Sequence, residues 1–465
     1  MTDLLALFET QRAAQASRRR DFDLRARLAA LDALRQVVLR HQPQIIAALA
    51  ADLAKPETEV LLTEVLPVLQ EISHTRRHLR RWMRARRVWP TLTTLGTSGR
   101  VQAEPRGQVL IIAPWNYPLV LALGPLVSAL AAGNSAIVKP SELAPATSAV
   151  LKQMLTEAFP ADLVAVVEGG VEVATDLLAL AFDHIFFTGS PAVGKIVMAA
   201  AAQTLASVTL ELGGKSPVIV GPGADVAKAA RHIAWGKFAN TGQTCIAPDH
   251  VFVHHSLIEP ITQALRAEIV RLYGPDPAVS RHFGRMISQR HTERLHSLLS
   301  EARAAGAEVL DGGGIDVAQR YIAPTLIAKT RPDMAISQQE LFGPVLPLIG
   351  YADVAEVIAR INAAPKPLAL YIFDRSTGFA DSIIRQTSSG SVAVNVVLMQ
   401  FLHPNLPFGG VGNSGIGAAH GHAGFLAFSH EKPILINRFS VLPLLFPPYT
   451  ARVKRLVGWL LRLVQ

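Results

Sequence analysis

The stretch QVLIIAPWNYPLVLALGPLVSALAAGNSAIVKP, from Gln108 to Pro140, decides the fold. It begins with a short apolar run that predicts a buried strand, continues with a longer apolar segment that predicts a buried helix, and ends with a second short apolar run. The alternation continues to residue 190 with two more helices and two more strands. Strands that alternate with helices predict an α/β domain with a doubly wound parallel sheet.

The segments on either side have patterns of their own. The first 85 residues are rich in Ala, Leu, Arg and Gln, with apolar residues at a spacing of three or four, which predicts helices. Residues 88–105 carry β-branched residues around two glycines, which predicts a strand hairpin. Beyond residue 210 the alternation resumes and predicts a second α/β domain, with strands at residues 216–221, 250–255, 323–327, 344–351, 368–374 and 391–396.

Composition limits the class of protein. Half of the 465 residues are apolar, which is enough for a large core, yet no apolar run reaches the roughly 18 residues of a membrane span. The first residues include Asp3 and Glu9 and lack the basic start of a signal peptide. Cys245 is the one cysteine of the sequence, so an internal disulfide is excluded. These features lead us to expect a cytoplasmic protein.

Nucleic acid and metal ions are not expected partners. Part of the net charge of +9 is concentrated in RRHLRRWMRARR, from Arg76 to Arg87. We interpret this stripe as the solvated face of a helix, because only Trp82 is interleaved with it and no zinc-finger or RNA-binding pattern follows. The histidines at residues 254–255 and 420–422 have no third ligand nearby at the spacing of a metal site.

Two glycine-rich motifs are similar to phosphate-binding loops. GVGNSG, residues 410–415, satisfies G-x-G-x-x-G but lacks the strand-to-helix setting, so we interpret it as a turn. GSPAVGKI, residues 189–196, ends in Ile196 where a P-loop needs a hydroxyl group for Mg²⁺. What remains is a strand that runs into a helix with Ser190 as its N-cap, and the free amides there suit a pyrophosphate. An ordinary strand–helix turn is the alternative.

Polar residues suited to acyl or cofactor chemistry stand at five expected strand ends or turns. Cys245 lies in the polar stretch GQTCIAPD, where a nucleophile is accessible, and not in the apolar setting of a structural cysteine. Glu211 ends an apolar strand in TLELGGKSP, where burial raises a carboxyl pKa and suits a general base. Asn116, in APWNYP, can donate to an oxyanion. The other two are VKPSE, residues 138–142, and ELFGP, residues 340–344. Taken singly, each polar residue has a capping, turn or ion-pairing role as its alternative.

The chain resembles the NAD(P)-dependent aldehyde dehydrogenases, and most of all their class 3 branch. The shared stretches run in the family's order from Pro114 to Gly417: PWNYP, KPSE, FTGSPAVGK, LELGGKSP, GQTCIAPD, ELFGP and PFGGVGNSGIG. The pair of LELGGKSP and GQTC is highly specific. The resemblance implies an α/β fold of two doubly wound parallel-sheet (Rossmann-like) domains plus a small β bridging element for oligomerisation.

The resemblance also implies the domain borders. Residues 1–84 and 106–210 would form the cofactor-binding domain, and residues 211–395 the catalytic domain. Residues 85–105 and 396–440 would form the bridging and oligomerisation element, and the likeness implies a homodimer.

Roles for individual residues follow from the same resemblance. Cys245 is the expected nucleophile, Glu211 the general base, and Asn116, with the backbone amide of Cys245, the oxyanion hole. The residues expected to bind the cofactor are Trp115, Lys139, Glu142, Gly189, Ser190, Gly194, Glu340 and Phe342. NAD is the expected cofactor and NADP the alternative, because a carboxylate such as Glu142 favours free ribose hydroxyls whereas Lys139 favours a 2′-phosphate.

The expected reaction is the oxidation of a hydrophobic aldehyde, aromatic or medium-to-long aliphatic, to its carboxylic acid. It would pass through a thiohemiacetal on Cys245, hydride transfer and hydrolysis of a thioester. An acylating dehydrogenase that passes the acyl group to coenzyme A is the alternative, and Glu211 favours water as the acceptor.

Residues 441–465 form a basic amphipathic tail that ends in RVKRLVGWLLRLVQ. An apolar face flanked by Arg and Lys is typical of a helix on a membrane surface, and the stretch is too short to span a membrane. A helix packed on the protein's own body or on a dimer partner is the alternative.

Overall fold

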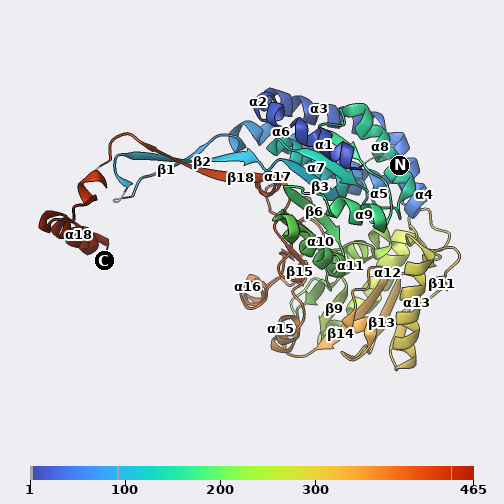
Figure 1. Ribbon diagram of the computed structural model, residues 1–465. Helices are drawn as coiled ribbons and strands as arrows, with labels where there is room; N and C mark the ends of the chain where they lie inside the picture. Colours follow the sequence, from blue (N-terminus) through green and yellow to red (C-terminus); the bar gives the residue numbers. More distant parts are fainter. Residues whose placement is uncertain (1–3, 92–93, 441, 465) are drawn as a thin grey trace.

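The structure is a computed structural model that describes residues 4–91, 94–440 and 442–464. Two α/β bodies lie against each other, and a long β arm extends from the first of them (Figure 1). The expected helical start is confirmed: its elements are α1 (Leu4–Ala13), α2 (Gln15–Asp21), α3 (Leu24–Arg40), α4 (Gln42–Leu53), α5 (Glu57–Val60), a π-helical turn (Leu61–Val65) and α6 (Leu66–Trp82).

The stretch that begins at Gln108 forms the centre of the first body. Its sheet has the order β17-β7-β6-β3-β4-β5, and all neighbours except β17 and β7 are parallel. The strands are β3 (Gln108–Ile112), β4 (Ser135–Lys139), β5 (Val164–Val166), β6 (His184–Gly189), β7 (Ser207–Leu212) and β17 (Gly415–Ile416). The helices between them are α7 (Val120–Ala132), α8 (Pro145–Ala158), α9 (Val171–Leu178) and α10 (Pro191–Thr204).

Both faces of this sheet are covered, which is why its strands are continuous apolar runs. In β3, Val109 and Ile111 belong to a core shared with α3, α6, α7 and α8. The alternate residues Leu110 and Ile112 belong to a second core with α1, α9 and α10. The predicted doubly wound sheet is therefore confirmed.

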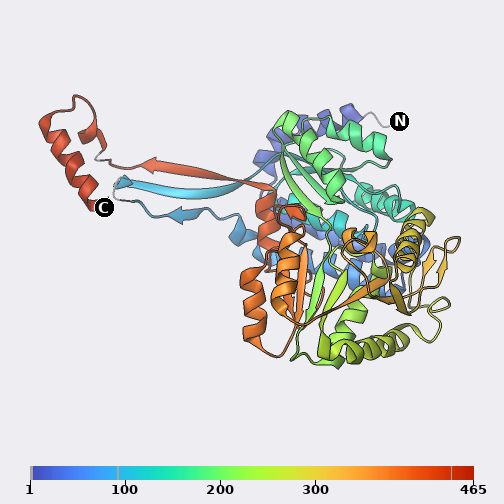
Figure 2. The ribbon, with the colours of Figure 1, turned by 90° about the horizontal axis from the view of Figure 1, so that it is seen from below.

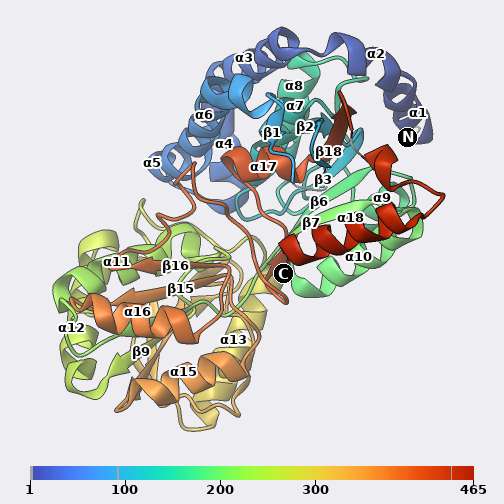
Figure 3. The same ribbon diagram turned by 90° about the vertical axis from the view of Figure 1, so that its left-hand side faces the viewer.

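The second body has a seven-stranded sheet in the order β10-β13-β14-β9-β8-β15-β16, parallel except for β10. Its strands are β8 (Pro217–Val220), β9 (His250–His254), β10 (Glu308–Asp311), β13 (Thr325–Ala328), β14 (Val345–Tyr351), β15 (Ala369–Phe373) and β16 (Ser391–Val394). Its helices are α11 (Val226–Phe238), α12 (Ile258–Tyr273), α13 (Gln289–Ala304), α14 (Ala335–Gln338), α15 (Val354–Ala363) and α16 (Thr377–Gln386), and a small ribbon joins β11 (Ile315–Asp316) to β12 (Tyr321–Ile322). Figure 3 shows the first body above the second.

The arm is a three-stranded antiparallel sheet of β1 (Arg86–Val88), β2 (Thr97–Pro105) and β18 (Ser429–Asn437). The strand pairing predicted for residues 88–105 is confirmed by β1 and β2, although β1 begins two residues before the predicted range. Strand β18, which follows α17 (Gly421–Ala427), adds the third strand. A 3₁₀ turn (Leu442–Leu445) and α18 (Ala451–Val464) follow β18. Residue 441 of the expected tail, and its last residue, lie outside the described residues.

Helix α18 lies beyond the tip of the arm, away from both α/β bodies (Figures 1 and 2). The alternative that the tail packs on the protein's own body is therefore wrong for the single chain, because the arm carries the tail away from the body. Among the described residues, no helix combines the length and the apolar character needed to cross a membrane. The expected border between residues 210 and 211 falls within β7, and the division into domains stays a proposal.

A buried ion pair joins the N-terminal helical layer to the start of α7. The Nζ atom of Lys55 lies 2.8 Å from Oε1 of Glu64, and both side chains are fully buried. The other carboxyl oxygen of Glu64 accepts hydrogen bonds from the backbone amides of Leu119 and Val120, at the start of α7, at 3.2 and 3.0 Å. A carboxylate at a helix N-terminus satisfies amides that have no partner within the helix. The pair thus fixes where α7 begins.

We expect Lys55→Met to lower the free energy of unfolding by about 3–5 kcal/mol, because it leaves the Glu64 carboxylate buried without its cation. Lys152→Met is the matched control: it breaks an exposed pair with Glu168 and is expected to change stability by less than about 1 kcal/mol. Thermal and urea unfolding of the two variants measure the difference, and equal effects would contradict the assigned role of the buried pair.

Candidate active site

Cys245 ends a loop that is held in an uncommon backbone conformation. The loop follows α11 with a turn of 3₁₀ helix, Ala239–Gly242, in which Asn240 and Thr241 have φ angles of 50° and 55°. Such left-handed conformations cost energy for residues with a side chain and persist only where the surroundings impose them. Here the backbone amide of Asn240 donates to Oε1 of Glu59 at 2.8 Å, and its side-chain amide donates to the carbonyl of Asn116 at 2.8 Å.

Two further hydrogen bonds join this loop to the segment after β3. Nδ2 of Asn116 donates to the carbonyl of Gln243 at 2.9 Å, and the hydroxyl groups of Tyr117 and Thr244 are 2.8 Å apart. Asn116 is buried, and one of its two amide hydrogens remains for another acceptor. The structure thus places the expected oxyanion donor beside the loop that carries Cys245.

The surroundings of Cys245 keep its thiol protonated in the protein alone. The side chain is half-buried, and burial raises the pKa of the thiol. Negative charge on Glu211 or Glu340 raises this pKa further, whereas the backbone amides of Cys245 and Ile246 lower it. The thiolate expected of a nucleophilic cysteine therefore requires an additional positive charge or a base at the site.

Glu211 lies in β7, opposite Gly415 of β17, and is buried. Its Oε1 atom has no hydrogen-bond partner in the described structure. Burial raises the pKa of Glu211 to about 8, as expected for a carboxyl group at the end of an apolar strand. The side chain can therefore gain and lose a proton near neutral pH, as a general base must.

Both bodies contribute further expected cofactor residues. Glu340 and Phe342 come from the second body, and Trp115 comes from the loop after β3. Oε1 of Glu340 accepts a hydrogen bond from the amide of Gly214 at 3.0 Å, and burial raises the pKa of Glu340 to about 7. The rings of Phe342 and Trp115 meet edge to face with centroids 5.4 Å apart. Nζ of Lys215 lies 2.5 Å from Asp249, which also accepts from the amide of Leu341, so this ion pair holds the loop of Glu340.

The remaining expected cofactor residues follow strands β4 and β6 at one edge of the first sheet. The strand register puts Lys139, Ile112 and Phe187 at the same level, so the residues after them share that edge. Nζ of Lys139 lies 2.8 Å from Oε2 of the half-exposed Glu142. The Ser190 hydroxyl caps α10 by accepting from the amide of Val193, as predicted for a strand–helix turn.

Glycines in this region allow close packing. A Cβ atom on Gly189 would lie 2.4 Å from the Phe187 ring, and one on Gly194 would lie 2.7 Å from Leu212. A Cβ on Gly213 would lie 2.4 Å from the Glu340 carboxylate. Gly214 and Glu340 also line a cavity of about 480 Å³, together with Pro191 at the start of α10. Space and a helix N-terminus therefore occur together, which fits a phosphate-bearing cofactor.

The second body supplies Cys245 and Glu340 ahead of its strands β9 and β14, whereas the first body supplies Asn116 and Glu211 near the carboxyl ends of β3 and β7.

Among the residues that the structure describes, no group of three His, Cys, Asp or Glu side chains could hold a metal ion.

Sequence reasoning missed the residues that hold the Cys245 loop, namely Lys55, Glu59, Glu64, Asn240 and Gln243. All are remote in sequence from Asn116. Lys55, Asn240 and Gln243 contact Asn116 itself, whereas Glu59 contacts Asn240 and Glu64 contacts Lys55. These contacts arise from the packing of the helical layer on the loop. A signal exists in KPETEVLLTEV, where Glu64 stands among apolar residues of a helical pattern. A charged residue on an apolar helix face indicates a buried partner.

Comparison with known proteins agrees with this geometry. Residues 3–434 match the family model described as the aldehyde dehydrogenase family. "Aldehyde dehydrogenase family 3 member A2" of Mus musculus is 46% identical over 428 residues, which cover 91% of this chain and 87% of that protein. "4,4'-diaponeurosporen-aldehyde dehydrogenase" of Staphylococcus aureus is 41% identical over 97% of this chain and 96% of its own length. "Aldehyde dehydrogenase, dimeric NADP-preferring" of Rattus norvegicus is 41% identical over 93% and 95% of the two chains.

Among solved structures, the substrate-bound state of Staphylococcus aureus AldH is similar, with a TM-score of 0.94 and 39% identity over 99% of this chain and 100% of that one. Both the family model and the relatives span nearly the whole chain. The chain therefore belongs to the aldehyde dehydrogenase family and is an NAD(P)-dependent oxidoreductase that oxidises aldehydes.

Proposed function

We propose that the protein oxidises a hydrophobic aldehyde to its carboxylic acid, with Cys245 as nucleophile and water as the final acceptor. The observation that carries this proposal is the hydrogen bond between Asn116 and Gln243, which brings an oxyanion donor next to the Cys245 loop. The substrate class rests on the apolar composition of the chain and on its similarity to named aldehyde dehydrogenases, among them the 4,4'-diaponeurosporen-aldehyde dehydrogenase of Staphylococcus aureus.

In the first half-reaction, Sγ of Cys245 forms a bond to the aldehyde carbon and the carbonyl oxygen becomes an alkoxide. The free amide hydrogen of Asn116 and the backbone amide of Cys245 stabilise this negative charge. Loss of hydride from the same carbon then leaves a thioester on Cys245. A bound oxidised nicotinamide supplies the hydride acceptor and a positive charge that favours the thiolate.

In the second half-reaction, Glu211 takes a proton from water as the water oxygen bonds to the thioester carbon. The tetrahedral intermediate collapses, the C–S bond breaks, and the acid leaves while Cys245 regains its thiolate. The raised pKa of Glu211 suits this step, because a stronger base removes the proton of water more readily. A carboxylate at this place favours water over coenzyme A as the acceptor.

Residues of this chain would hold the cofactor in two places. The N-terminus of α10, with Gly189, Ser190 and Gly194, suits the pyrophosphate. Lys139 and Glu142 suit the adenosine ribose, and Glu340 with Phe342 and Trp115 suits the nicotinamide end. We place NAD first because the partly exposed Glu142 carboxylate repels a 2′-phosphate; the rat relative's name keeps NADP as the alternative.

A homodimer in the cytoplasm is part of the proposal. The arm supports the dimer, since β18 exposes apolar side chains such as Leu435 and Ile436 and the rat relative is named dimeric. The tail supports peripheral contact with an anionic membrane surface. Helix α18 exposes Val457, Trp459 and Leu461, and its sequence carries Arg and Lys but no acidic residue.

Oxidation should be visible as NADH formation at 340 nm over a panel of aliphatic aldehydes of rising length plus benzaldehyde and coniferaldehyde, each with NAD and with NADP. We expect Cys245→Ala to abolish activity on every substrate that the wild type oxidises, because the acyl-accepting sulfur is lost. Cofactor binding, followed by fluorescence, should survive as the control for folding. Substantial oxidation by Cys245→Ala would contradict the proposal.

Glu211→Gln should keep a full pre-steady-state burst of NADH and slow the following turnover about 100-fold or more, because only hydrolysis needs the base. In the wild type, the hydrolysis rate should rise with pH through about 8 and level off above, since the carboxylate form exists above the raised pKa of Glu211. The variant should lose this inflection. Stopped-flow measurements between pH 6 and pH 9 test both points, and an unchanged turnover in Glu211→Gln would exclude the assigned role.

Flotation with liposomes tests the tail. The full chain should float with vesicles that contain an anionic lipid and stay behind with neutral vesicles, because α18 is basic and exposed. A chain that ends at Thr450 should float with neither, and equal flotation of the two chains would contradict membrane contact.

A further inference from the structure

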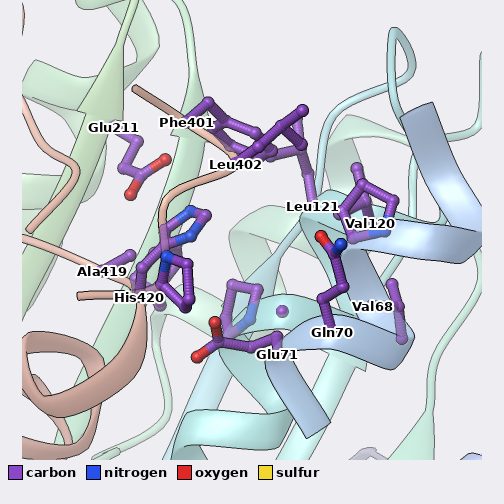
Figure 4. A pocket seen from close by; sticks show the side chains of 15 residues that line it. Val68, Gln70, Glu71, Val120, Leu121, Glu211, Phe401, Leu402, Ala419 and His420 are labelled. Atoms are coloured by element: carbon purple, nitrogen blue, oxygen red, sulfur yellow. The ribbon is translucent and has the colours of Figure 1, made fainter. Parts of the chain in front are cut away.

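A pocket lies beside Glu211 and extends toward α6 (Figure 4). Its walls come from α6, from α7 and from the segments on either side of β17, and the space between them, solvent at the mouth included, is about 580 Å³. Gln70 on α6 is exposed, so the pocket reaches the surface there. A pocket of this size that leads from the proposed base to solvent suits the tail of the aldehyde.

The wall that α7 contributes to this pocket has a gap in it. Val120, Leu121, Gly124 and Pro125 line the pocket, and their spacing puts them on one face of the helix. The other described residues of α7 are buried, whereas Gly124 is partly exposed and has no side chain. The apolar wall therefore recedes by one side chain at Gly124, about one turn beyond Val120.

Packing does not require a glycine at this position. A Cβ atom on Gly124 would meet no atom of a neighbouring element within 4 Å, and the φ angle of Gly124 is not positive. Gly424 of α17 is the contrast, since a Cβ atom there would lie 2.4 Å from Oγ of Ser128 on α7. A glycine inside a helix costs about 0.5–1 kcal/mol relative to alanine. An unfavourable residue that faces open space in a pocket indicates a functional reason for its presence.

The proline that follows Gly124 supplies a structural alternative. The ring of Pro125 crowds the Cβ atom of the residue before it, and a glycine has no such atom. If relief of this crowding were the only reason for Gly124, a side chain there would destabilise α7 and lower the rates with all aldehydes alike. If the space in the pocket is the reason, the loss depends on the shape of the aldehyde.

The walls opposite the gap are stiff. Pro67 and Pro404 contribute rings that fix their own backbone, and both line the pocket. The ring of Phe401 meets those of Phe408 and His420 edge to face, with centroids 5.0 and 4.7 Å away. Extra width for a substrate is therefore available at the gap in α7.

We propose that Gly124 determines the substrate specificity of this site: the space left by its missing side chain admits aldehydes whose apolar tail carries a ring or a branch. This inference rests on the proposed function, with the aldehyde carbon at Cys245 and the tail in the pocket. A straight chain passes the gap without needing it, whereas a wide tail fills it. A larger residue at this position occupies the space, so it excludes the wide tail and leaves room for the narrow one.

The test compares Gly124→Ala and Gly124→Leu with Gly378→Leu as the matched control. Gly378 lies in α16 (Thr377–Gln386) of the second body, away from the pocket, and a Cβ atom there would have Oγ of Ser376 at 3.7 Å as its nearest neighbour. The substrates are hexanal, whose tail is narrow, and 4-tert-butylbenzaldehyde, whose tail is wide. NADH formation at 340 nm gives kcat/KM for each enzyme with each aldehyde.

We expect Gly124→Leu to lower kcat/KM for 4-tert-butylbenzaldehyde at least about ten-fold, mainly through KM, and to change kcat/KM for hexanal by less than about three-fold. Gly124→Ala should give a smaller loss of the same kind because it adds one methyl group, and its melting temperature should not fall below that of the wild type. Gly378→Leu should match the wild type with both aldehydes.

Three results would contradict the proposal. An unchanged ratio of the two kcat/KM values in Gly124→Leu would overturn it, and a lower melting temperature of Gly124→Ala would then assign the glycine to relief of crowding at Pro125. A wild type that oxidises hexanal but rejects 4-tert-butylbenzaldehyde would overturn it and leave the proposed function intact. A wild type that oxidises no aldehyde would overturn the function proposed above together with this inference.

Discussion

The site depends on one constraint: the loop that carries Cys245 must be held against the edge of the first sheet. The bonds from Asn116 to Gln243 and from Tyr117 to Thr244 cross between the two α/β bodies at this point. The left-handed residues Asn240 and Thr241 could not persist without such partners. Behind them, the buried pair of Lys55 and Glu64 fixes the start of α7, and Lys55 also donates to the carbonyl of Asn116 at 3.4 Å. The position of Asn116, the proposed oxyanion donor, is therefore set from two directions.

Burial is the common cause of the raised pKa values in this site. It raises the pKa of Glu211 to about 8 and that of Glu340 to about 7, and it raises the pKa of the Cys245 thiol. In the absence of a positive charge, the cysteine stays protonated and unreactive. Under the proposed function, Cys245 becomes a nucleophile only when the positive charge of the cofactor is present.

The arm and the tail are separate from this chemistry. The arm is a sheet of its own, formed by β1, β2 and β18, and α18 lies beyond its tip (Figure 2). Their exposed apolar side chains leave hydrophobic surface that a second chain or a membrane surface would cover.

The sequence by itself determined the fold class, the parallel strands of both sheets, the hairpin of the arm and the family, because buried parallel strands are short apolar runs and the motifs at their ends are local. The antiparallel edge strands β10 and β17 were not predicted. It also predicted the raised pKa of Glu211 from an apolar strand end. Only the tertiary structure decided which residues hold the Cys245 loop, that the thiol pKa is raised, and that the tail lies away from the body. Glu59, Glu64 and Asn240 lie far apart in the sequence, and Glu71 meets Gly421 across 350 residues. Contacts of this kind arise when separate elements pack together, and no local pattern records them.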